Sequence, residues 1–191
     1  MEIILDVSEY QSPAQLDAIL ADAPDTIVAV YIKAAQDLVY RDEAIALYAR
    51  ICQRHSTLFG YYDYMGNHQT AEQSQFFTAA IAKAPTAALV PMLDCEGTYD
   101  LYEIGVQNFR AHLGERVIEY SSLAYQDRYA SERLRWVAQY PEPFLERGSD
   151  VPASSIEQYR SQGFTAWQFT DRYLGQVDAS VLLVSLDALR V

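Results

Sequence analysis

Apolar runs of strand length alternate with amphipathic stretches of helix length along the first two thirds of the chain. Runs rich in β-branched and apolar residues predict strands at 2–7, 26–34, 58–65, 86–93 and 116–122. Apolar residues at helical spacing predict helices from 12 onwards, at 41–52, 70–84 and 99–114, and near 123–131. This order is typical of a parallel sheet covered by helices.

Three of these helices carry end signals in the sequence. Ser12 and Pro13 are typical of an N-cap and a first helical position. Thr70 and Gln73 have the spacing of a capping box. Gly114 is expected to end the fourth helix.

The pattern changes after residue 131, where helices become scarce. Strands are predicted at 134–140, 164–170 and 176–182, with a short helix near 154–162 and an irregular loop at 141–153. With the first five, these make eight strands, a number that can close into a barrel. The sequence therefore predicts an α/β fold in a single domain, a barrel that lacks the last helices of a standard (β/α)8 barrel. An open, doubly wound sheet is the alternative.

Composition narrows the classes of partner. The 191 residues include 26 Asp and Glu but only 14 Lys and Arg, a formal charge of −12, so no nucleic-acid partner is expected. No apolar run approaches the ~18 residues of a membrane span, and the N-terminus lacks a signal-peptide pattern. Without metal-ligand histidine spacing or a glycine-rich phosphate loop, neither a metal nor a cofactor is predicted. Cys52 and Cys95 are expected to be free thiols.

The stretch AALVPMLDCEG at 87–97 places two acids at the end of an apolar run. Side chains alternate along a strand, so Asp94 and Glu96 should face one way and Cys95 the other. Ionised carboxylates are costly to bury unless they are paired, and α/β barrels carry their active sites at the carboxyl ends of the strands. The two acids are therefore candidates for chemistry at the barrel mouth.

Three further acids occupy comparable positions. Asp6 ends the first predicted strand, Asp63 lies late in the third, and Asp178 lies within the last. In a closed sheet the first and last strands are neighbours, so Asp6 and Asp178 should approach each other. Repulsion and burial would then raise some carboxyl pKa values and leave one acid protonated, as glycosidic bond cleavage requires. For Asp63 alone, a turn former or helix cap is the alternative interpretation.

Aromatic residues are a second hint of a sugar site. The chain has 15 Tyr, and Tyr61, Tyr62 and Tyr64 surround the end of the third strand, while Trp167 precedes Gln168. Rings with an apolar face and a polar edge suit the C–H faces of sugars. Packing in the core is the alternative for most of them.

Several short motifs stand in order along nearly the whole chain. They are DVSEYQ (6–11), YIKAA (31–35), GYY (60–62), LDCEG (93–97), WQF (167–169) and VDASVL (177–182). In this order they resemble the motifs of glycoside hydrolase family 25, the Chalaropsis-type lysozymes. The resemblance implies an irregular TIM-like (β/α)5(β)3 barrel that hydrolyses, with retention, the β-1,4 bond between N-acetylmuramic acid and N-acetylglucosamine in peptidoglycan.

The resemblance also implies roles for individual residues. Glu96 would be the proton donor and Asp94 its partner, while Asp6 and Asp178 would line the same pocket. Tyr62 would contact the substrate at the reacting sugar. Retention can use a protein carboxylate or the substrate's acetamido group as nucleophile, and the sequence leaves both open.

Three positions depart from the family's pattern. Asp63 stands where the family often has His, Gln36 where it frequently has Glu, and Gln139 where it has Arg. The loss of a cation and the gain of a carboxylate predict a more negative pocket and a higher pKa for Glu96.

The expected partner is the glycan strand of bacterial peptidoglycan, with no membrane insertion. The substrate-binding candidates are Tyr62, Asp63, Tyr120, Trp167 and Gln168. The negative charge should repel anionic wall polymers, so a shaped site or a separate wall-binding module would supply targeting. The expected place of action is extracellular, at the cell wall, reached by holin release or after removal of a leader. The alternative is a non-catalytic carbohydrate-binding or phage structural module with the same barrel.

Overall fold

The computed structural model describes residues 1–23, 25–66, 71–96, 102–128 and 133–191. Nine strands within these residues form one sheet. They are β1 (Glu2–Val7), β2 (Thr26–Gln36), β3 (Tyr40–Arg41), β4 (Leu58–Tyr64), β5 (Met92–Asp94), β6 (Ile118–Ser122), β7 (Leu134–Ala138), β8 (Ala166–Tyr173) and β9 (Val177–Leu182).

Eight of the strands close into a barrel. The sheet order is β1-β9-β8-β7-β6-β5-β4-β2-β3, and a further pairing joins β1 to β2, so that β3 alone lies outside the ring. Neighbours are parallel except for β9, which runs antiparallel to both β8 and β1, and for β3. The start of β9 therefore lies at the same end of the barrel as the carboxyl ends of the other seven strands.

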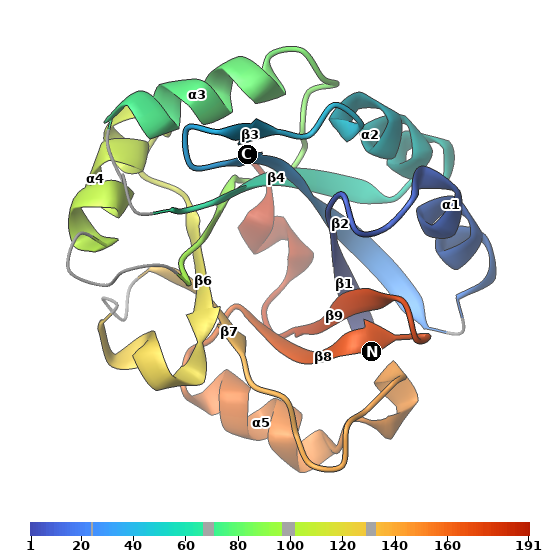
Figure 1. The fold of residues 1–191 in the computed structure, drawn as a ribbon. Helices are drawn as coiled ribbons and strands as arrows, with labels where there is room; N and C mark the ends of the chain where they lie inside the picture. The colour runs from blue at the N-terminus through green and yellow to red at the C-terminus, as the bar shows by residue number, and fades with distance from the viewer. Residues whose placement is uncertain (24, 67–70, 97–101, 129–132) are drawn as a thin grey trace.

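Five α-helices of the described chain surround the barrel (Figure 1). They are α1 (Pro13–Asp22), α2 (Ile45–Arg54), α3 (Ala71–Ile81), α4 (Tyr102–Leu113) and α5 (Ala153–Ser161). A 3-10 helix, Leu123–Arg128, follows β6 in place of the fifth helix of the first half. β8 and β9 are joined by a tight hairpin, at which Leu174 and Gly175 have positive φ. The predicted (β/α)5(β)3 barrel is confirmed, and the open sheet is wrong.

Apolar side chains form two layers, one inside the barrel and one between the strands and the helices. The inner layer includes Ile4, Tyr31 and Trp136. The rings of Tyr31 and Trp136 meet edge to face at 5.3 Å, and the indole N–H of Trp136 donates to Ser180 Oγ at 2.8 Å. These fully buried side chains fill the barrel at this level. Any site must therefore lie above them, at the mouth.

The strand predicted at 86–93 is largely wrong. Only Met92–Asp94 is a strand, since Pro91 has no N–H to donate to a ladder. Leu89 instead forms an isolated bridge with Arg190. The apolar run is still buried, because Leu89 and Val90 belong to the inner layer.

The predicted helix ends are mostly confirmed. Ser12 caps α1, because its Oγ accepts from the Gln15 N–H and the Gln15 side chain accepts from the Ser12 N–H. Gly114, just after α4, has a φ of 104°, which favours glycine. Thr70 lies outside the described residues, so its capping box stays a prediction. In the described part of the chain, no helix has both the length and the apolar character needed to cross a bilayer.

Candidate active site

Four carboxylates converge at the mouth of the barrel. Asp6 lies near the end of β1, Asp94 ends β5, and Glu96 follows two residues later. Asp178 is the second residue of β9, and it is the direct partner of Asp6 in the β1–β9 pairing. The charges of Asp178 and Asp94 raise the pKa of Asp6, and the charge of Glu96 raises the pKa values of Asp94 and Asp178. The structure therefore places these four sequence-predicted acids around one point.

Asp6 and Asp178 influence each other's ionisation, since they are direct partners in the β1–β9 pairing. Burial, followed by the charge of Asp178, raises the pKa of Asp6 well above its usual range. Burial raises the pKa of Asp178 to about 6, although the hydrogen bond from Asp6 lowers it. Two buried carboxyls so close together cannot both ionise at low cost, so the pair favours a state in which one of them stays protonated.

Asp94 carries an unpaired oxygen. Burial, and then the charge of Glu96, raise the pKa of Asp94 well above its usual range, while the charge of Lys33 lowers it. Its Oδ1 is buried and has no hydrogen-bond partner among the described residues. An ionised buried oxygen without a partner is costly, and burial accordingly favours the protonated form of Asp94.

Glu96 is the most accessible of the four acids. Its side chain is exposed, yet desolvation by the surrounding mouth raises its pKa. The polar hydroxyl of nearby Tyr120 opposes this shift and lowers the pKa. Asp63 is not among the causes of the shift, so the structure does not support the expectation that Asp63 raises the pKa of Glu96. An acid with a raised pKa that can still reach a ligand is suited to donate a proton.

Gln168 and two tyrosines connect these acids. The Gln168 side chain accepts hydrogen bonds from the hydroxyls of Tyr120 at 2.7 Å and Tyr140 at 2.9 Å. Its Nε2 donates to Asp6 Oδ2 at 3.0 Å. Tyr62 also borders the cluster, because burial and the charges of Asp6, Asp94 and Asp178 raise its pKa. Three of the five predicted substrate-binding residues thus lie at the mouth.

The other two candidates, Asp63 and Trp167, face away from the mouth. Asp63 follows Tyr62 in β4 and is fully buried, where its Oδ2 accepts from Gln73 of α3 at 2.7 Å. Trp167 precedes Gln168 in β8, and its ring stacks on Tyr159 of α5 at 4.4 Å. Adjacent strand residues point to opposite faces. The structure therefore contradicts the prediction that these two side chains bind substrate.

Lys33 is a residue that the sequence interpretation missed. Only 5% of it is exposed, and its Nζ donates to Gln36 Oε1 at 2.8 Å and to Glu9 Oε1 at 3.4 Å. Nζ also lies 5.5 Å from the ring centre of Tyr64, whose partner in the β4–β5 pairing is Asp94. Lysine is rarely buried without a reason. Its position in the apolar strand, two residues after Tyr31, could have indicated an inward-facing cation.

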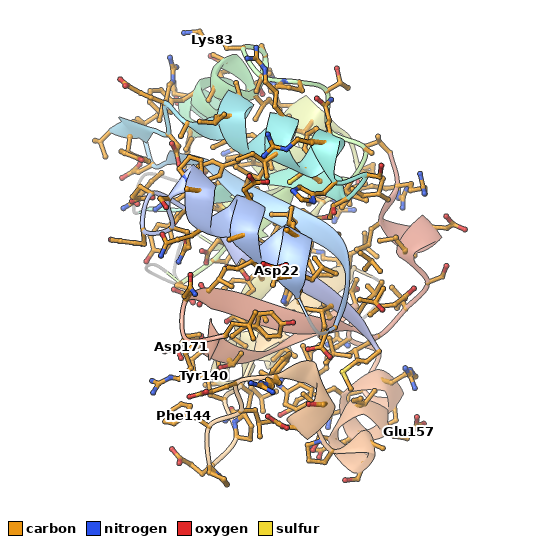
Figure 2. The ribbon with its side chains drawn as sticks, turned by 90° about the vertical axis from the view of Figure 1, so that its right-hand side faces the viewer. Asp22, Lys83, Tyr140, Phe144, Glu157 and Asp171 are labelled. Carbon is orange, nitrogen blue, oxygen red and sulfur yellow. The ribbon has the colours of Figure 1, made fainter. Side chains whose placement is uncertain are left out.

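One lip of the mouth is aromatic. Tyr140 lies 6.5 Å from Phe144 between ring centres, and the guanidinium of Arg172 lies 4.4 Å above the Phe144 ring. Figure 2 shows Tyr140, Phe144 and Asp171 on the same side of the molecule. Phe144 is exposed. No spacing signal in the sequence singled out this lip, because it is assembled from the loop after β7 and the end of β8.

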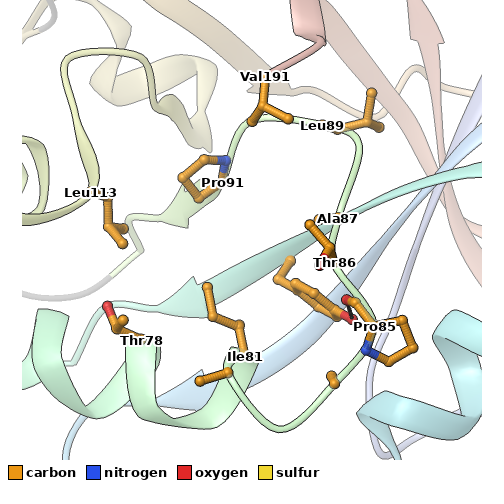
Figure 3. A pocket seen from close by; sticks show the side chains of 12 residues that line it. Thr78, Ile81, Pro85, Thr86, Ala87, Leu89, Pro91, Leu113 and Val191 are labelled. Carbon is orange, nitrogen blue, oxygen red and sulfur yellow. Dashed lines mark hydrogen bonds between the residues drawn. The ribbon is translucent and has the colours of Figure 1, made fainter.

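Two hollows flank the barrel at different ends. A hollow of about 520 Å³ includes Glu9, Tyr40 and Asp42 in its lining, and Lys33 links it to the acids through Glu9. An apolar cavity of about 430 Å³ lies before β5, at the other end of the barrel (Figure 3). Its lining includes Ile81, Pro85, Leu89, Leu113 and Val191. Within the described residues, no group of three or more His, Cys, Asp or Glu side chains could hold a metal ion.

Comparisons with known proteins agree with this geometry. The family model for glycosyl hydrolases family 25 matches residues 5–176. No curated protein sequence matches the chain. Among solved structures, the muramidase from Trichobolus zukalii is similar with a TM-score of 0.69 and 18% identity, over 98% of this chain and 96% of that one. The bacterial lysozyme from Streptomyces coelicolor has a TM-score of 0.68 and 17% identity, over 98% and 94%.

The CTP1L endolysin is also similar, with a TM-score of 0.69 and 18% identity. The match covers 95% of this chain but 66% of the endolysin chain, so this chain spans slightly less than two thirds of that relative's length. At such identities the solved structures establish the fold, and the family model establishes the relationship. The chain belongs to family 25 of the glycosyl hydrolases.

Proposed function

We propose that the protein is a muramidase, which hydrolyses the β-1,4 bond between N-acetylmuramic acid and N-acetylglucosamine in bacterial peptidoglycan with retention of configuration. Family membership supports the reaction class. The observation that carries the proposal is the convergence of Asp6, Asp94, Glu96 and Asp178 at one barrel mouth, with pKa values raised to different extents. Glycosidic cleavage needs carboxyls in different protonation states.

Glu96 is the proposed general acid and base. Its exposed carboxyl can reach a glycosidic oxygen that enters the mouth, and its raised pKa keeps part of it protonated. Protonation of the leaving oxygen breaks the bond to C1. The ionised Glu96 then takes a proton from the attacking water.

Asp94 is proposed to stabilise positive charge. In the free barrel, burial favours its protonated form. Asp94 loses this proton to solvent before the reaction, and the ionised carboxylate then stabilises the positive charge that develops next to Oδ1 in the transition state. Lys33 assists by lowering the pKa of Asp94.

The substrate's own acetamido group is the proposed nucleophile. Its carbonyl oxygen would attack C1 and form an oxazolinium ion, whose N–H Asp94 would stabilise. A fluorinated sugar that traps covalent intermediates tests this step. Covalent labelling of Asp94 would refute acetamido participation and leave the muramidase assignment in place.

The whole chain, 1–191, is proposed to form the catalytic domain, and peptidoglycan at the cell wall is its proposed place of action. The barrel is closed by β9, and Arg190 still pairs with Leu89, so the C-terminal residues are part of the fold. The formal charge of −12 does not favour adsorption to anionic wall polymers. A separate module would therefore help to hold the enzyme at the wall.

Mass spectrometry of wall fragments tests the proposal. Purified peptidoglycan is incubated with the wild type, with Glu96→Gln and with Glu157→Gln, a matched control whose carboxylate is exposed on α5 (Figure 2). New N-acetylmuramic acid reducing ends should form with the wild type and the control, and about 10²–10⁴-fold more slowly with Glu96→Gln. Fragment binding without cleavage by the wild type would favour the non-catalytic binding module instead.

A further inference from the structure

Arg172 presents open hydrogen-bond donors at the aromatic lip of the mouth. Its guanidinium lies 4.4 Å above the Phe144 ring, and its Nε donates to Asp171 Oδ1 at 3.1 Å. Among the described residues, its two Nη groups have no hydrogen-bond partner. Because the ring contact uses the face of the guanidinium, the edge formed by the two Nη groups stays open to a ligand.

An irregularity in β8 places this side chain beside the acids. The ladder between β8 and β9 shifts register after Thr170, where Asp171 and Arg172 of β8 lie opposite the single residue Asp178 of β9. The Arg172 N–H donates to Thr170 Oγ1 at 3.2 Å within this bulge. Bulges re-aim side chains and are frequent next to active sites. Arg172 therefore stands at the rim, directly across the ladder from one of the four acids.

The lip is continuous with the proposed site through observed contacts. The Phe144 ring lies 6.5 Å from the ring of Tyr140, and the Tyr140 hydroxyl donates to Gln168 Oε1 at 2.9 Å. Gln168 Nε2 in turn donates to Asp6 Oδ2 at 3.0 Å. Figure 2 shows Tyr140 and Phe144 on the same side of the molecule. A ligand that reaches the acids can therefore extend over the lip.

The loop that carries these rings is fixed to its surroundings. The Leu174 N–H of the β8–β9 hairpin donates to the Glu146 carbonyl at 3.1 Å. Asp25 Oδ2 accepts from the Gly148 N–H at 3.0 Å and from the Tyr173 hydroxyl at 2.9 Å. A ligand would therefore meet a preformed surface and pay little to order it.

The open edge of Arg172 has the chemistry of a carboxylate site. Two parallel N–H groups of a guanidinium match the two oxygens of a carboxylate. The pair with Asp171 is exposed, with 48% and 43% of the two side chains accessible, so it contributes little and does not block this edge. With a formal charge of −12, the protein as a whole does not attract anions, and an anionic ligand group needs a local cation.

We propose that Arg172, supported by the Phe144 ring, binds a carboxylate on the acyl arm of N-acetylmuramic acid, so that the enzyme prefers peptidoglycan to uncharged amino-sugar polymers. The carboxylate is that of the lactyl group in a peptide-free strand or that of the stem peptide. The identity of the ligand rests on the proposed function. The preference for an acid can be measured by binding, without turnover.

Calorimetric titration of Glu96→Gln with two matched pairs of tetrasaccharides tests the proposal. One pair is a peptide-free strand of alternating N-acetylglucosamine and N-acetylmuramic acid with lactyl carboxylates, and the same strand with lactyl amides. The other pair carries a stem dipeptide that ends in a carboxylate or in an amide. At least one acid should bind about 3–10-fold more tightly than its amide.

Substitutions at the lip should remove this preference. Adding Arg172→Gln should bring the ratio of the two affinities to about one, and Arg172→Lys should retain only part of it, because an ammonium lacks the planar fork. Phe144→Leu should lower the ratio less, because it removes only the ring that supports the guanidinium. Arg54→Gln is the control, since this exposed arginine ends α2 and pairs with Asp17, away from the lip. It should leave the ratio unchanged.

Four results would overturn the inference. They are equal affinities for acid and amide in both pairs, a preference that survives Arg172→Gln, an equal loss in Arg54→Gln, and no binding of any of the four probes. The pair that shows the preference identifies the source of the carboxylate. A wild type that binds the acids through Arg172 but does not cleave peptidoglycan would refute the muramidase function alone. Cleavage without a preference for the acids would refute the role of Arg172 alone.

Discussion

The buried carboxylate of Asp178 carries a cost to the fold, and the substitution Asp178→Asn should expose that cost. The pKa of Asp178 is raised from a usual value of 3.8 to about 6, chiefly by burial. The folded protein therefore binds this proton more tightly than the unfolded chain does. Stability that is present below about pH 4 is lost as the pH rises through 6. Asp178→Asn removes this loss, because its amide cannot ionise.

The magnitude follows from the size of the shift. A difference of about two pH units, at about 1.4 kcal/mol per unit, gives about 3 kcal/mol as the ceiling above pH 7. For a domain of this length, that corresponds to roughly 6–12 °C in Tm. The Asn side chain has nearly the same size and still offers one oxygen to a protonated Asp6, so the two side chains can keep their arrangement.

Urea unfolding of the wild type and Asp178→Asn between pH 4 and pH 8 measures the effect. The stability of the variant relative to the wild type should increase with pH by up to about 3 kcal/mol, while peptidoglycan turnover falls. The control is Asp187→Asn, whose exposed carboxylate pairs only with Arg190 among the described residues. A pH-independent difference between Asp178→Asn and the wild type would refute the burial argument.

Three further changes should have separate signatures. Lys33→Met removes the charge that lowers the pKa of Asp94, so the acid limb of kcat/KM should move to higher pH, and an unchanged limb would exclude this role of Lys33. Gly60→Ala places a Cβ 2.5 Å from Cε1 of Tyr31 inside the filled barrel. It should destabilise the fold by about 1–3 kcal/mol in urea unfolding, and wild-type stability would show that Tyr31 can move. Because the protein carries a charge of −12, raising NaCl from about 0.02 to 0.15 M should speed wall lysis more than turnover of a short soluble fragment. Equal salt effects on both substrates would argue against repulsion by the wall.

The barrel fold could be predicted from the sequence because the strands are buried on both faces. Continuous apolar runs such as 26–34 and 58–65 predict such strands, and the order of helices between them fixes a parallel sheet. The apolar run at 86–93 led to a wrong strand prediction, since a segment can be buried inside a barrel without forming the backbone hydrogen bonds of a strand. Pro91 and the bridge from Leu89 to Arg190 depend on the C-terminus, which local patterns do not include.

The candidate site was predicted in part, and the failures have a geometric cause. Asp6 and Asp178 follow from closure of the sheet, and Asp94 and Glu96 from alternation along one strand. The same alternation means that adjacent residues of a strand face opposite ways. Because Tyr62 and Gln168 face the barrel interior, their neighbours Asp63 and Trp167 face the helices. Alternation along the strand could have placed Lys33 on the inner face, but not its contact with Glu9, which lies in the loop after β1. Tyr140 could not be assigned from spacing, because it lies in the loop after β7 and reaches Gln168 of β8.

A crystal structure of Glu96→Gln with a peptidoglycan tetrasaccharide tests the central claim most directly. The glycosidic oxygen between N-acetylmuramic acid and N-acetylglucosamine should lie within hydrogen-bonding distance of the side chain at position 96, with the acetamido group against Asp94. Asp6 and Asp178 should border the same sugar. A glycan bound elsewhere, for example in the apolar cavity lined by Ile81 and Val191, would contradict the assignment of the barrel mouth as the active site.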